Sequence, residues 1–173
     1  MLKSIPAVAV AVSLWAMPVG AQGVPPTTAT DLSAADIQAL VKSFPKDKTT
    51  DQLLRLADMG KYNVAVGAVS RAATASGGGA LSHDKVTEVY YVLRGSGTQV
   101  SGGAMVGAKP TMIPVVGPSV SGSAIEGGRT TRLGPGDMQI IPPGVPHMWS
   151  AIDAGGVDYL VIRIDPDHVV TKK

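Results

Sequence analysis

The feature that most constrains this chain is the stretch of residues 81–95, which places an imidazole and a carboxylate just before an apolar run. His83 and Glu88 precede residues 89–93, whose β-branched and aromatic content is typical of a β-strand. Residues 94–97 contain two glycines and are expected to form a turn. The stretch therefore predicts a strand with the side chains of His83 and Glu88 at or just before its N-terminal end.

A second cluster, residues 136–150, has a related organisation. A glycine turn, a short strand, a proline–glycine turn and His147 follow one another in it. Alternate residues of a strand share a face, so each cluster is expected to present its polar group on the same side as nearby aromatic residues. The residues expected to share a face are Glu88, Tyr90 and Val92 in one strand, and His147, Trp149 and Ala151 in the other.

Together the two clusters resemble the paired sequence motifs of the cupin family. Leu81 stands where the family's first motif has a leading histidine, and Ala151 stands where the second motif has a closing asparagine. The resemblance covers roughly residues 62–164 and implies an all-β fold, the cupin double-stranded β-helix or jelly-roll barrel. The positions that match the two motifs are His83, Glu88, Gly95, Gly136, Pro142, Gly144 and His147.

The resemblance implies that His83, Glu88 and His147 converge on one point inside the barrel. Two imidazoles and one carboxylate form the facial triad of non-haem Fe(II) oxygenases, and the same ligands also hold Mn²⁺, Zn²⁺ or Ni²⁺. Leu81 removes a fourth ligand, although three protein ligands suffice in many catalytic sites. We therefore predict a divalent metal ion (Fe, Mn, Zn or Ni) as the cofactor.

Three further side chains are candidates for a substrate pocket. Tyr90 and Trp149 lie two residues from a predicted ligand, where an aromatic ring either stacks on a planar substrate or fills the barrel. Arg71 ends the predicted strand 60–71, where its fork either binds an anion at the barrel mouth or lies on the surface. His168 lies outside both motifs and is expected in solvent.

The start of the chain has the pattern of an export signal. Residues 1–21 combine Lys3, an apolar run and small residues before a cleavage position after Ala21; an uncleaved membrane anchor is the alternative. Because the chain contains no cysteine, the mature protein has no disulfide and is held by its core. We expect a periplasmic or secreted protein.

The rest of the chain divides into a leader with a short helix (22–60), a cupin barrel (61–165) and a charged, frayed tail (166–173). Ser33 is the predicted N-cap of the helix, which ends by Pro45. Its apolar face needs cover from the barrel or from a partner chain. Residues 49–59 fit either a helix or a strand, and the glycine- and proline-rich residues 101–130 predict an inserted loop or an extra hairpin.

Composition excludes some classes of partner. The chain has 173 residues, enough for one domain with a core, and its net charge of +2 is too small to predict binding to nucleic acid or to an anionic membrane. The favoured function is a metal-dependent small-molecule enzyme of the oxygenase, isomerase or lyase type. The alternatives are a non-catalytic cupin that binds a small ligand, favoured by Leu81, and a structural or sensory module that pairs through its helix. The resemblance also implies a homodimer.

Overall fold

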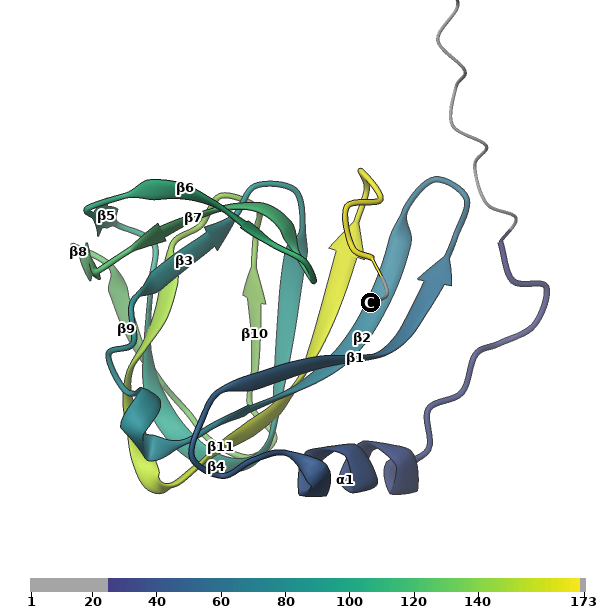
Figure 1. Ribbon diagram of the computed structural model, residues 1–173, viewed down its shortest axis with the longest axis horizontal. Coiled ribbons are helices and arrows are strands. Elements are labelled where there is room, and N and C mark those ends of the chain that lie inside the picture. The colour runs from purple at the N-terminus through teal and green to yellow at the C-terminus, as the bar shows by residue number, and fades with distance from the viewer. Residues whose placement is uncertain (1–24, 172–173) are drawn as a thin grey trace, which may run out of the picture.

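The structure is a computed structural model that describes residues 25–171 (Figure 1). The predicted signal peptide, residues 1–21, lies outside the described residues. The helices and strands, in chain order, are α1 (Ala34–Ser43), β1 (Thr50–Asp58), β2 (Asn63–Arg71), the 3-10 helix η1 (Ala73–Ala75), β3 (Ala80–His83), β4 (Thr87–Ser101), β5 (Ala104–Val106), β6 (Lys109–Ile113), β7 (Gly117–Gly122), β8 (Ala124–Glu126), β9 (Arg129–Leu133), β10 (Met138–Ile141) and β11 (His147–Asp165).

Nine of the described strands form one antiparallel sheet that curls into a barrel, and β5 and β8 form a separate two-stranded sheet (Figure 1). Its main path runs β1-β2-β11-β3-β7-β6, and β4 pairs with β9, β10 and β11. The last strand, β11, therefore pairs with three strands that come early in the chain, β2, β3 and β4. The all-β jelly-roll barrel with a short N-terminal helix, predicted from the sequence, is confirmed.

The predicted turn at residues 94–97 is wrong, because β4 runs through it without interruption. Gly95 has a φ of 71°, and a Cβ there would lie 1.9 Å from the carbonyl oxygen of Gly156. The pairing of β4 with β11 shifts register between Ile152 and Val157, opposite this glycine. The glycine therefore permits an irregularity within a long strand pair, and it does not end the strand.

The sheet begins earlier in the chain than the predicted boundary at residue 61. Residues 49–59, which fitted either a helix or a strand, contain β1, and β1 pairs with β2 along its length. Residues 101–130 are also more regular than a loop: β6 pairs with β7 and β5 pairs with β8. Of the two predictions for this segment, the structure has the extra hairpin.

Two buried clusters form the core. The larger one surrounds the aromatic side chains of Tyr90, Trp149 and Tyr159, whose rings pack against one another. The smaller one contains Val116 and Val170 and is covered by apolar residues of β1.

The C-terminal segment is attached to the core, so the predicted frayed tail is wrong for the described residues. Asp165 is fully buried, and its carboxylate accepts hydrogen bonds from the backbone N–H groups of Val169 and Val170. Val170 is 2% exposed and packs in the smaller cluster. His168 is exposed, as expected.

Helix α1 lies against one end of the barrel (Figure 1). Ser33 caps it by accepting a hydrogen bond from the backbone N–H of Asp36, and the helix ends before Pro45, as predicted. None of its residues is buried, and its apolar residues Ile37 and Val41 line an open groove of about 770 Å³ shared with β2, β4 and β11. No helix in residues 25–171 has the length and apolar character that crossing a bilayer requires.

Candidate metal centre

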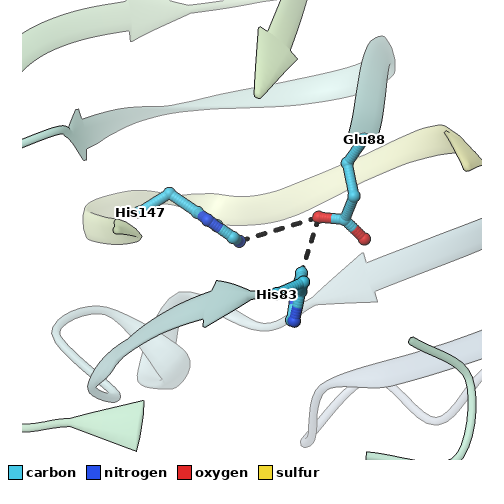
Figure 2. Close-up of side chains that lie close together, drawn as sticks. All are labelled: His83, Glu88 and His147. Atoms are coloured by element: carbon cyan, nitrogen blue, oxygen red, sulfur yellow. Dashed lines mark ion pairs between the residues drawn. The ribbon is translucent and has the colours of Figure 1, made fainter. Parts of the chain in front are cut away.

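The three predicted ligands meet inside the barrel. His83 is the last residue of β3, Glu88 lies near the start of β4, and His147 opens β11. Figure 2 shows both imidazoles directed at the Glu88 carboxylate, with each Nε2 atom 3.6 Å from Oε2. All three side chains are buried, and their ligand atoms lie within 4.8 Å of one another. Residues far apart in the chain thus form one cluster because β3 and β4 both pair with β11.

The hydrogen bonds of both rings leave the Nε2 atoms free to bind a metal. His147 Nδ1 lies 3.1 Å from the carbonyl oxygen of Val145, which can only accept, so Nδ1 carries the proton. His83 Nδ1 lies 2.9 Å from Ser119 Oγ, whose own proton goes to the carbonyl of Gly117 at 3.1 Å. Ser119 therefore accepts from His83. Both Nε2 atoms present lone pairs, as metal-ligating histidines do.

The spacing of the donor atoms also fits a first-row divalent metal. A separation of 3.6 Å between Nε2 and Oε2 is too long for a hydrogen bond. It is close to the distance of about 3–3.4 Å between neighbouring ligand atoms when metal–ligand bonds are about 2.1 Å. Two imidazoles and one carboxylate suit Fe²⁺, Mn²⁺, Zn²⁺ or Ni²⁺, and the residues present fit such an ion.

Glu88 is held ionised by a partner that the sequence did not reveal. Arg163 donates from Nε to Glu88 Oε1 at 2.9 Å and pairs through its other nitrogens with Asp51. Tyr90 donates its hydroxyl to Oε2 at 2.8 Å. Burial raises the pKa of Glu88, but the charge of Arg163, joined by those of the two histidines at the low pH where they are protonated, outweighs it and lowers this pKa to about 2. The carboxylate is therefore ionised throughout the physiological range.

Burial holds both histidines in the neutral form. It lowers the pKa of His83 to about 4, although the nearby charge of Glu88 opposes this. Burial likewise lowers the pKa of His147, again against the effect of Glu88. Metal binding requires neutral imidazole and ionised carboxylate, and these are the forms that the barrel interior stabilises near neutral pH.

The three ligands line a cavity of about 50 Å³ together with two of the predicted pocket residues, Tyr90 and Arg71. Arg71 donates from Nε to the hydroxyl of Tyr159 at 3.0 Å. Leu81 also lines the cavity, and it lies opposite His147 in the pairing of β3 with β11. The apolar side chain thus occupies the place beside the triad where the resemblance expects a further histidine.

Trp149 and Ala151 lie away from this cavity. Trp149 is 4% exposed and packs in the larger core cluster, which is the filling role considered for it. Ala151 was expected to share the face of His147, but it is exposed, because a register shift between Trp149 and Ala151 reverses the alternation.

Sequence reasoning missed the residues that support the ligands. Arg163 had a signal: it is a lone arginine in an apolar strand and alternates with the inward-facing Tyr159 and Val161. Ser119 had none, because it lies in the glycine- and proline-rich segment, for which the sequence predicted a loop or a hairpin but no pairing with the strand of His83. Both act on a ligand from a strand far away in the chain.

Comparison with known protein families supports the fold. The family model described as Cupin matches residues 62–172. The chain belongs to the cupin family. No curated protein matches this cupin.

Several solved structures are similar to this cupin at low sequence identity. A protein of unknown function from Rhizobium leguminosarum is 16% identical over 79% of this chain and 96% of its own, with a TM-score of 0.44. Iron(II) HppE is 16% identical over 68% of this chain and 51% of its own, with a TM-score of 0.43. Oxalate decarboxylase from Bacillus subtilis is 19% identical over 69% of this chain and 26% of its own, with a TM-score of 0.40. The cupin thus spans about half of HppE and about a quarter of oxalate decarboxylase.

Proposed function

We propose that this cupin is a metal-dependent enzyme that acts on a small molecule by oxygenase, isomerase or lyase chemistry. One observation carries the proposal: His83, Glu88 and His147 present two unprotonated Nε2 atoms and one ionised oxygen to the same point in a buried cavity. A buried carboxylate and two desolvated imidazoles are expensive to maintain without a function. A divalent ion bound there would polarise a substrate carbonyl or, if iron, bring O₂ and substrate together.

The two tyrosines that line the cavity, Tyr90 and Tyr159, differ in their hydrogen bonds and so in what they can do there. Tyr90 commits its proton to Glu88, which orients the carboxylate, and burial raises the pKa of Tyr90 well above its ordinary value. Tyr91, the next residue, lies on the outside of the barrel and is 38% exposed. Tyr159 accepts from Arg71 and forms no other side-chain hydrogen bond within residues 25–171, so its hydroxyl proton is free for a ligand. Tyr159 is therefore the cavity tyrosine that can donate a hydrogen bond to a bound molecule.

A second function is favoured by Leu81. An apolar side chain beside the triad removes one possible ligand and gives the cavity an apolar wall. This supports a non-catalytic cupin that binds a small ligand in the same cavity. The two functions differ in whether a metal is part of the working protein.

The metal content of the purified protein separates the two functions. We expect about one divalent ion per chain in the wild-type protein, measured by elemental analysis after gel filtration, and loss of most of it in His147→Ala. His168→Ala is the matched control, because His168 is exposed and distant in sequence from both motifs. A metal-free wild-type protein that still binds small ligands would support the non-catalytic function.

Export and pairing remain proposals that rest on the sequence. We propose that residues 1–21 direct the protein to the periplasm or the medium and are removed after Ala21, as their pattern indicates. We also propose a homodimer. The exposed apolar side chains of Tyr91, Met138 and Ile140, which lie on the paired strands β4 and β10, support an interface between two copies.

A further inference from the structure

We propose that the ligand of this cavity is a small anion, a short-chain carboxylate, and that Arg71 binds its charged group beside the metal. The inference rests on the metal centre of the proposed function and names the substrate class of that site.

The first observation is that Arg71 has no anionic partner. Within residues 25–171 its guanidinium forms no ion pair, and its one side-chain hydrogen bond is the one from Nε to the hydroxyl of Tyr159. Arg163, the other arginine of the cavity, is engaged by both Glu88 and Asp51. A partly buried guanidinium with unused N–H groups favours an anion with two oxygens, which its fork can bind in bidentate fashion.

The second observation is the charge balance of the cavity lining. Among the charged side chains of the lining, two arginines, Arg71 and Arg163, balance two carboxylates, Glu88 and Asp51. A divalent metal ion on the triad would add two positive charges that no described side chain of the lining compensates. Since charge inside a protein is costly unless it is paired, the metal-loaded cavity favours an anionic ligand over a neutral one.

The third observation is the size and character of the space. About 50 Å³ leaves room for about three to five water-sized groups, because one such group needs about 10–15 Å³. Several walls are apolar, among them Val69, Leu81 and Val116. The space therefore suits a carboxylate with a very short chain and excludes a sugar ring in this conformation of the barrel.

Tyr159 completes the recognition of the anion. Its hydroxyl accepts from Arg71 and lines the same cavity, so its free proton can go to a carboxylate oxygen next to the guanidinium. Burial raises the pKa of Tyr159, so the hydroxyl stays protonated and remains a donor. Arg71 and Tyr159 thus act as a pair of positioning donors, with the triad opposite.

The test compares acetate with its neutral analogue acetamide by isothermal titration calorimetry, in a buffer free of carboxylates. Manganese-loaded and metal-free protein are titrated in parallel. We expect acetate to bind at one site per chain of the loaded protein, and acetamide to bind at least about tenfold more weakly. Arg71→Met should weaken acetate binding at least about tenfold and leave the manganese content unchanged. Arg132→Met, which removes an exposed arginine, should change neither.

The possible results distinguish the anion site at Arg71 from the metal centre of the proposed function. Equal binding of acetate and acetamide, no acetate binding to loaded protein, or normal acetate binding by Arg71→Met would overturn it. A protein that takes up no manganese would contradict the metal centre; acetate selectivity that depends on Arg71 in that metal-free protein would then support the anion site alone. If Arg71→Met does not fold, acetate binding by Arg71→Lys and by Tyr159→Phe tests the inference instead. Both must weaken acetate binding, and unchanged binding in both would overturn the inference.

Discussion

Arg163 donates a hydrogen bond from Nε to Oε1 of Glu88 at 2.9 Å, and so holds one carboxylate oxygen while the other faces the two imidazoles. The two residues are opposite each other in the pairing of β4 with β11. This arrangement fixes the direction of the carboxylate and keeps it ionised. It also joins the candidate metal centre to the stability of the barrel, because neither charge can be removed alone without leaving the other buried.

Glu88→Gln is therefore expected to affect both metal binding and stability. The substitution removes the charge that a metal ligand needs, and it also breaks the buried ion pair with Arg163. We expect the metal content to fall at least about tenfold. We also expect the metal-free protein to lose about 2–3 kcal/mol of unfolding free energy, since Asp51 alone only partly compensates the buried charge of Arg163.

Urea unfolding in the presence of a chelator measures the stability of this variant, and elemental analysis measures its metal. Asp153→Asn is the control, because it removes one partner of the exposed ion pair with Arg132 and should change the stability little. Equal losses of unfolding free energy in Glu88→Gln and Asp153→Asn would show that the buried pair of Glu88 and Arg163 stabilises the fold no more than an exposed pair does.

Ser119→Ala tests the assignment of the His83 tautomer. The hydroxyl of Ser119 accepts from Nδ1 of His83 and so holds Nε2 toward Glu88. Its loss should lower metal affinity about tenfold to a hundredfold, as is usual for residues that orient a ligand, while all three ligands remain. Competition with a fluorescent chelator measures the affinity, and Ser121→Ala, on the same strand, is the control. Equal affinities of the two variants would argue against this hydrogen bond.

Leu81→His is expected to strengthen metal binding. Leu81 lines the cavity and lies opposite His147, so an imidazole there can supply a fourth ligand. We expect affinity to rise at least about tenfold in the same chelator competition. Leu81→Phe, which introduces a ring without a donor nitrogen, should not raise affinity. An unchanged affinity in Leu81→His would mean that position 81 does not face the metal.

The metal-free protein is expected to lose stability as the pH falls from about 6.5 to about 4. Burial lowers the pKa of His83 from 6.5 to about 4, so across this window the unfolded chain binds more protons than the folded one. The shift corresponds to a loss of about 3 kcal/mol, and His147 adds to it in the same direction. Glu88, with its pKa lowered from 4.5 to about 2, extends the loss below pH 4.5.

Urea unfolding of metal-free protein at a series of pH values checks this expectation. His83→Gln removes one of the groups and should flatten the profile between pH 6.5 and 4. A wild-type profile that is already flat in this window would mean that the histidines are not held neutral by the fold.

The sequence was sufficient to predict the barrel and to name three side chains that meet inside it, because the spacing of the two motifs resembles that of the cupin family. Strand alternation and the spacing of the two motifs placed Glu88 and Tyr90 on one face and His147 on another, and the closed sheet brings these faces together. The same alternation failed at Ala151, because a register shift in β11 depends on its partner strand and not on local residues.

The supporting contacts could not be predicted, because each joins residues that are far apart in the chain. Arg163 meets Glu88 only through the register of β4 with β11, and Ser119 meets His83 only through the pairing of β3 with β7. The packing of the C-terminal segment could not be predicted for the same reason. Its charged residues favoured a solvated tail, but Asp165 is buried and holds the backbone of Val169 and Val170.

The most direct measurement of the central claim is an anomalous diffraction map of crystals of this protein grown with Mn²⁺. The account predicts one strong peak bound by Nε2 of His83, Nε2 of His147 and Oε2 of Glu88, at about 2.1–2.3 Å from each. It also predicts that the peak is absent from crystals of His147→Ala. A wild-type cavity without a peak, or a manganese ion bound only at a surface site such as His168, would contradict the account.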